Sequence, residues 1–340
     1  MSAHRRREPA WVSLPDEELL DRRISRLGLR IAGTVLEKRV DALARALERA
    51  GLRFRPHVWL STDWFSPEGV PGLAMPFYLA HPRLVALERR QMLEAEGSSG
   101  PACLKLLRHE TGHAIDTAYR LHHRKRWREH FGPASRPYRA TYVPRPGSRN
   151  FVHHLDDYYA QSHPVEDFAE TFAVWLARPG RWRREYQDWP ALRKLGYVDE
   201  LMAEIADQPA RVRCRERTDS VGTLNMTLRE YYARKKAHYG EDDRSVYDHE
   251  LERLFRSGGR GKRAAVFLRE RRARLRRQIT RWTGQRAFAV DEVLGDMIRR
   301  CRELGLRLSH SERESAQAAI VIVTLHTARI QRIRHREYVR

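Results

Sequence analysis

The fold class and the chemistry of the chain both depend on one stretch, LLRHETGHAIDTAY, residues 106–119. It contains His109-Glu110-Thr-Gly-His113, the pattern HExxH, within a helix that we expect over 99–124. Residues four apart lie on one face of a helix, so both imidazoles can bind one metal ion while Glu110 lies beside its open coordination position. Because the chain has sixteen histidines, HExxH can also arise by chance, and the prediction needs a third ligand.

A second stretch, SHPVEDFAETFAVWL (residues 162–176), supplies that candidate ligand. A catalytic zinc ion needs three protein ligands, and a histidine six residues after the motif is excluded because Tyr119 stands there. Glu166 and Glu170 are four residues apart on a predicted capped helix that is otherwise apolar, which favours a packed face over a solvated one. We expect Glu166 to bind zinc and Glu170 to orient the ring of a ligating histidine, His109.

Together, HETGHAIDTAY (109–119) and YAQSHPVEDFAETFAVWL (159–176) resemble the bacterial zinc-binding metallopeptidases of the gluzincin type. The same arrangement resembles the catalytic domain of anthrax lethal factor. The resemblance is tight over 103–176 and extends more loosely over 54–201. It implies that each chain binds one zinc ion through His109, His113 and Glu166. It also implies that Glu110 is the general base.

The resemblance also implies a tyrosine that donates to the developing oxyanion. This role falls on Tyr159, seven residues before the ligand glutamate, and the adjacent Tyr158 is the alternative. Asp116, one turn after the second histidine, is expected to form hydrogen bonds rather than to bind the metal. His163, at the start of the ligand helix, is expected to be a turn or pocket residue.

Composition bounds the class of protein. The chain has 340 residues, 41% of them hydrophobic and 32% charged, which fits about two folded domains. Its longest apolar run, 318–323, is too short for a membrane span, and no apolar segment follows the basic N-terminus as a secretory signal would require. Three cysteines without a CxxC pair argue against disulfides and a zinc ribbon. We expect a soluble, cytoplasmic protein.

The net charge of +21 is concentrated in one region. Residues 256–286 contain twelve Lys and Arg and one acid, Glu270. Spacing of apolar residues within this run favours a solvated face of a packed helix over a surface for nucleic acid or another anionic partner. The run HHRKRWR (122–128) is expected to continue the metal-binding helix, either as its solvated end or as a patch for acidic peptides.

The overall prediction is an α+β, predominantly helical protein with a zincin-like core and a small sheet. Strands are expected over 54–60 and 73–80, and within 71–80 a core strand is favoured over an edge strand that pairs with substrate. A loop is expected over 132–150, a linker over 257–261 and a helix from 311, with 320–325 either helix or strand. The predicted divisions are an N-terminal helical segment, the metallopeptidase domain, a helical extension and a basic helical region, over 1–52, 53–205, 206–257 and 258–340.

Three functions are compatible with these residues. The favoured one is a zinc metallopeptidase acting on a peptide or protein substrate. A zinc hydrolase of a non-peptide amide is the second. The third is a zinc-stabilised protein without enzymatic activity that binds nucleic acid or an acidic partner, but structural zinc sites fill all four positions and need no base such as Glu110.

Overall fold

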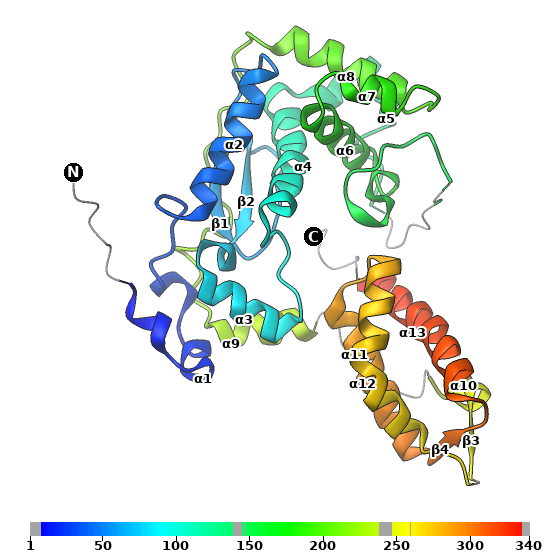
Figure 1. The fold of residues 1–340 in the computed structure, drawn as a ribbon. Coiled ribbons are helices and arrows are strands. Elements are labelled where there is room, and N and C mark those ends of the chain that lie inside the picture. The colour runs from blue at the N-terminus through cyan, green and yellow to red at the C-terminus, as the bar shows by residue number, and fades with distance from the viewer. Residues whose placement is uncertain (1–7, 139–144, 146, 238–246, 259, 335–340) are drawn as a thin grey trace. The chain divides into compact units, whose positions relative to one another are not determined.

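The computed structural model describes residues 8–138, 145, 147–237, 247–258 and 260–334, so the N-terminal residues and part of the predicted loop over 132–150 lie outside the described residues. The chain divides into two compact units (Figure 1). The first comprises 1–89, 95–139 and 143–232, and the second comprises 90–94, 140–142 and 233–340. The predicted boundary at 257/258 falls inside the second unit.

The first unit is mostly helical. Its α-helices are α1 (Asp16–Leu20), α2 (Val35–Arg49), α3 (Pro82–Met92), α4 (Gly100–Tyr119), α5 (Lys125–Phe131), α6 (Pro164–Ala177), α7 (Arg181–Glu185), α8 (Leu192–Ile205) and α9 (Leu228–Ala237). Of these, α3 and α9 begin in the first unit and end in residues that belong to the second. Short 3-10 helices lie at η1 (Ala10–Ser13), η2 (Ile24–Arg26), η3 (Phe77–Ala80), η4 (Leu121–His123) and η5 (Asp156–Gln161).

A small parallel sheet lies in this unit. It consists of β1 (His57–Ser61) and β2 (Gly72–Pro76), paired from His57 with Gly72 to Ser61 with Pro76. A Cβ atom at Gly72 would lie 2.4 Å from the His57 ring, so a larger residue there would displace that ring. All five residues of β2 are buried, and the Ala74 N–H donates to the Phe65 carbonyl at 2.8 Å. These contacts support a core strand over Gly72–Pro76, whereas the rest of the predicted strand, Phe77–Ala80, forms η3 instead.

The two helices that carry the motifs pack closely against each other. Helix α4 begins at the N-cap Ser99, whose hydroxyl accepts from the Ala102 N–H, and α6 begins at the N-cap His163. The two helices cross at Gly112, where a Cβ atom would lie 2.7 Å from the Ala169 Cα. The second variable position of HETGH is therefore a contact point that needs glycine.

The prediction that the metal-binding helix continues to 124 is wrong. Helix α4 ends at Tyr119 because Arg120 adopts a left-handed conformation (φ 54°). The cations that follow lie on η4 and α5, where Arg124 pairs with Glu204 and Arg126 pairs with Glu200. The run 122–128 is thus divided between η4 and the start of α5, and two of its arginines pair with acidic residues of α8.

The second unit is a helical bundle with one antiparallel pair of strands. Its elements are α10 (Asp248–Leu254), β3 (Phe255–Ser257), α11 (Ala264–Thr283), α12 (Ala287–Glu303), β4 (Leu306–Leu308) and α13 (Glu312–Arg334). Residues 320–325 are therefore helical. Two glycines of the predicted linker lie next to the strand pair instead. Gly258 follows β3 with a left-handed backbone (φ 75°). Gly261 packs against β4, because a Cβ atom there would lie 2.7 Å from the Leu308 carbonyl oxygen.

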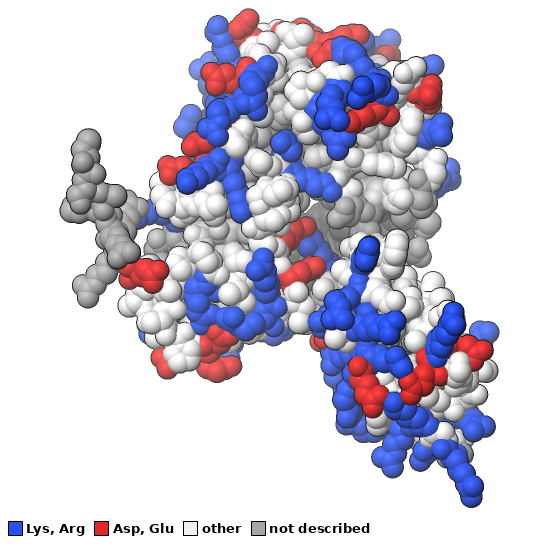
Figure 2. Space-filling model, viewed as in Figure 1, with Lys and Arg blue, Asp and Glu red and all other residues white. Residues whose placement is uncertain are grey.

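The mostly helical fold with small sheets is confirmed. Lys and Arg spread over the visible face, with acidic side chains among them (Figure 2). On α11 several cations are paired: Arg271 with Glu312, and Arg272 and Arg276 with Asp291. Within the described part of the chain, no helix combines the length and apolar composition needed to cross a bilayer.

Candidate metal centre

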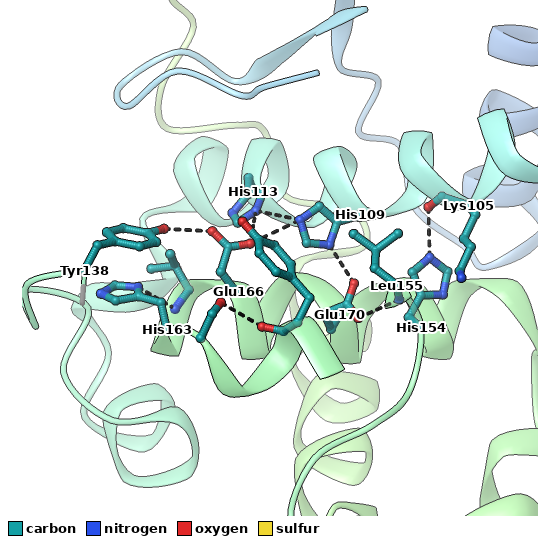
Figure 3. Close-up of polar contacts among 12 residues, drawn as sticks. Lys105, His109, His113, Tyr138, His154, Leu155, His163, Glu166 and Glu170 are labelled. Atoms are coloured by element: carbon teal, nitrogen blue, oxygen red, sulfur yellow. Dashed lines mark hydrogen bonds and ion pairs between the residues drawn. The ribbon is translucent and has the colours of Figure 1, made fainter. Parts of the chain in front are cut away.

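The structure brings His109, His113 and Glu166 together, two from α4 and one from α6 (Figure 3). The Nε2 atoms of the two histidines are 3.2 Å apart. Glu166 Oε2 lies 3.1 Å from His113 Nε2 and 3.2 Å from His109 Nε2. Three potential ligand atoms therefore form a nearly equilateral triangle.

The size of this triangle fits zinc. Tetrahedral coordination with Zn–N and Zn–O distances of about 2.0–2.1 Å places neighbouring ligand atoms about 3.3–3.4 Å apart. The observed separations of 3.1–3.2 Å are slightly shorter. An ion bound to all three atoms would need only a small outward movement of the side chains. The donor set, two imidazoles and one carboxylate, is also one that catalytic zinc sites use.

Glu170 fixes the orientation of one ligand. Its Oε1 lies 2.8 Å from His109 Nδ1, and its Oε2 accepts from the Leu155 N–H at 2.8 Å. The carboxylate is fully buried. The His109 ring therefore presents Nε2 to the triangle and Nδ1 to Glu170, the arrangement that stabilises metal-binding histidines.

The three groups perturb one another's protonation. Burial opposes charge on His109, but its hydrogen bonds to Glu166 and Glu170 raise its pKa well above the ordinary value. Burial likewise opposes the charge on Glu166, whereas His113 and His109 lower its pKa well below the ordinary value. The pKa of His113 is also raised, so the cluster pairs an ionised carboxylate with two histidines that hold a proton more tightly than usual.

Glu110 lies beside this triangle and is not part of it. Its side chain is buried, with 6% of the residue exposed, and it interacts electrostatically with His109, His113 and Glu166. Burial raises its pKa, against the effect of the two histidines. A buried carboxylate next to a metal site is the kind of group that can accept a proton from a bound water molecule and later return it.

The two candidate oxyanion tyrosines differ in their surroundings. The Tyr159 ring lies against His109, with ring centroids 5.6 Å apart. Tyr158 has a left-handed backbone (φ 54°), and its ring packs against His153 at 5.1 Å. Of the two, Tyr159 has the ring in contact with a ligand, and its role as a donor stays a prediction.

Asp116 contacts the end of α4. Its carboxylate accepts from the His122 N–H at 2.8 Å and lies 2.7 Å from His122 Nδ1. The hydrogen bond to Asp116 raises the pKa of His122, although burial acts against it. These contacts stabilise the turn that follows the helix and do not involve the three candidate ligands.

Sequence reasoning missed Tyr138, whose hydroxyl donates to Glu166 Oε1 at 2.7 Å. Its ring stacks on His163 with centroids 3.8 Å apart. No spacing or motif distinguishes this tyrosine, because it lies in an irregular connection 25 residues after His113. Its only signal in the sequence is an aromatic residue within a Pro- and Gly-rich segment.

A partly buried histidine and a buried aspartate also contact the ligand helices and their neighbours. His154 Nε2 bonds to the Lys105 carbonyl at 2.8 Å, and burial lowers the pKa of His154 to about 4. Asp167, next to the ligand glutamate, pairs with Lys194 at 2.5 Å. Both contacts attach segments outside the ligand pair to α4 and α6.

Comparison with known proteins supports the resemblance seen in the sequence. No curated protein and no solved structure gives a significant match to the chain. A family model does match, and the matched segment contains both ligand helices with all three candidate ligands. Residues 88–178 match the family described as "Putative zinc-binding metallo-peptidase".

Proposed function

We propose that the chain is a zinc-dependent metallopeptidase that hydrolyses peptide bonds. The observation that carries this proposal is the triangle of His109, His113 and Glu166 with the buried Glu110 beside it. Structural zinc sites use four protein ligands, whereas catalytic sites use three and keep one position open. Among the described residues the group contains three.

Each residue has a distinct task in the proposed reaction. His109, His113 and Glu166 would hold zinc, which supplies a Lewis acid and makes a water molecule acidic enough to lose a proton near neutral pH. The Glu110 carboxylate takes that proton and later delivers it to the nitrogen of the leaving amine. Glu170 keeps the His109 ring oriented through Nδ1. Tyr159 would donate from its hydroxyl to the oxyanion.

The proposal is tested by metal analysis of the purified chain together with cleavage of a mixed peptide library. We expect one zinc ion per chain, loss of cleavage on chelation and recovery on addition of zinc. A zinc-loaded chain that cleaves no peptide in the library would contradict the proposed activity.

The ligand assignment has its own test. Glu166→Ala removes one of three ligands and should lower zinc occupancy sharply. Glu200→Ala on α8, which removes an acid paired with Arg126 at the surface, is the matched control and should keep full occupancy. Full zinc retention by Glu166→Ala would show that the third ligand lies elsewhere.

A further inference from the structure

The two oxygens of the Glu166 carboxylate have different partners. Oε2 faces the histidine nitrogens at 3.1 and 3.2 Å, whereas Oε1 accepts from the Tyr138 hydroxyl at 2.7 Å (Figure 3). A carboxylate can bind a metal through one oxygen or through both. With Oε1 engaged by a phenol, only Oε2 remains directed at the ligand triangle.

The tyrosine is itself fixed by the start of the ligand helix. Its ring stacks on His163 with an interplanar angle of 11°. His163 Nδ1 accepts from the Val165 N–H at 3.3 Å, so its Nε2 carries the proton and donates to the Arg136 carbonyl at 2.5 Å. One neutral histidine thus caps α6 and also holds the segment that carries Tyr138.

We propose that Tyr138 is a positioning residue that makes Glu166 a one-oxygen ligand. The inference rests on the proposed function only in taking Glu166 as a metal ligand. Binding through both oxygens would use a further coordination position, and a catalytic site needs that position for water or substrate. By donating to Oε1, Tyr138 keeps the coordination number of the metal low and keeps Oε2 of the carboxylate directed at the metal.

The test compares metal binding by the full-length wild type and Tyr138→Phe. Phenylalanine keeps the ring that stacks on His163 and removes only the hydroxyl. We expect zinc affinity, measured by competition with a chelator, to fall about tenfold, the lower end of the effect of losing such an outer hydrogen bond. With Co²⁺ as the probe, the visible absorption should weaken, because binding through the freed oxygen raises the coordination number.

Tyr197→Phe on α8 is the matched control. Its ring also stacks on a histidine, His130, with an interplanar angle of 11°, and its buried hydroxyl makes no hydrogen bond within the described part of the chain. We expect wild-type zinc affinity and a wild-type Co²⁺ spectrum for this variant. Thermal unfolding of the two metal-free variants should match the wild type, which separates a positioning effect from a loss of structure.

A second variant tests the role of His163. Asparagine is as good an N-cap as any residue, so His163→Asn preserves the start of α6 while removing the stacking and the bond to Arg136. It should weaken zinc binding in the same direction as Tyr138→Phe. The double variant should lose less than the sum of the two effects, because both act on one hydrogen bond.

The outcomes distinguish this inference from the proposed function. Wild-type affinity and spectrum in Tyr138→Phe would overturn the positioning role whatever the enzymatic activity. Weaker binding and an altered spectrum in a chain that cleaves no peptide would uphold the positioning role and reject the peptidase. A wild-type chain that binds neither metal would overturn both.

Discussion

The two long helix pairs of the chain bury opposite kinds of side chain. Between α11 and α12 the buried seam is apolar and includes Leu268, Leu275, Ile279, Val290, Val293 and Leu294. Two acids of α12 pair with arginines: the partly buried Asp291 pairs with Arg272 and Arg276, and the buried Asp296 pairs with Arg299. The pair α4 and α6 instead buries charged or titratable side chains, namely His109, Glu110, Glu166, Asp167 and Glu170.

This contrast separates stability from function. Burial of a charged group is costly unless the group is paired, so a helix pair selected for stability alone resembles α11 and α12. In α4 and α6 the buried polar groups are paired through hydrogen bonds, such as the one between His109 and Glu170. Clusters of this kind mark functional sites more often than structural ones.

The largest expected effect is on catalysis. Glu110→Gln is nearly isosteric but cannot accept a proton, so turnover should fall about a hundred- to ten-thousandfold. Zinc content should stay the same, because neither imidazole changes. Activity against the best library peptide, with zinc analysis of the same sample, measures both. Wild-type turnover would show that another group activates the water.

Breaking a buried pair beside the site should strongly reduce stability. Lys194→Met leaves Asp167 buried without its cation, which should cost about 3–5 kcal/mol in the free energy of unfolding. Urea denaturation of the full chain measures it. Adding Asp167→Asn to the Lys194 variant removes the buried charge and should restore part of the loss; no recovery would mean that the charge is not the cause.

The neutral, partly buried His154 makes a pH-dependent contribution to stability. Its pKa is lowered to about 4, so the unfolded chain binds a proton more readily between about pH 6.5 and 4. Stability should therefore fall as the pH drops through this window, by about 3 kcal/mol at most. Urea denaturation of wild type and His154→Gln at pH 7 and 4.5 isolates this part, and equal pH dependence in both would reject it.

Loss of the outer carboxylate should affect metal binding more moderately. Glu170→Gln weakens the bond to His109 Nδ1, and zinc affinity should decrease about 10- to 100-fold. Competition with a chelator measures the affinity. Glu204→Gln, an acid paired with Arg124 at the surface, is the control and should bind zinc as the wild type does. Unchanged affinity in Glu170→Gln would remove Glu170 from the metal centre.

The smallest effect is expected in the second helix pair. Arg276→Gln removes one of the two arginines at Asp291, and the other keeps two side-chain hydrogen bonds to it. The free energy of unfolding should change by less than about 1 kcal/mol. Urea denaturation is again the measurement. A loss of stability as large as that in Lys194→Met would contradict the difference that we infer between the two helix pairs.

The meeting of the three candidate ligands could be predicted because helical spacing alone places each pair on one face. His109 and His113 are four residues apart, and so are Glu166 and Glu170. The antiparallel crossing of the helices then joins His109 to Glu170 and His113 to Glu166. Local periodicity thus determines which side chains share a face, and close packing at Gly112 brings the two faces together.

Other features depend on contacts that no local pattern encodes. Helix α4 ends where Arg120 adopts a left-handed backbone conformation. A glycine at this position would have predicted the end of the helix, but the sequence has an arginine there. Tyr138 reaches Glu166 from an irregular segment, and Lys194 meets Asp167 across 27 residues. The glycines of 257–261 suggested a linker, but Gly258 and Gly261 lie at the turn after β3 and close to β4.

The connection between α4 and α6 has a consequence for how this site can diversify. Tyr138, His154 and Tyr159 all approach the ligand helices from the one stretch of chain between them, 120–163. Irregular connections tolerate substitution and changes in length far better than packed helices do. Changes of sequence or length within this stretch can therefore alter the surroundings of the candidate metal centre, while the close crossing at Gly112 keeps the two ligand helices in place.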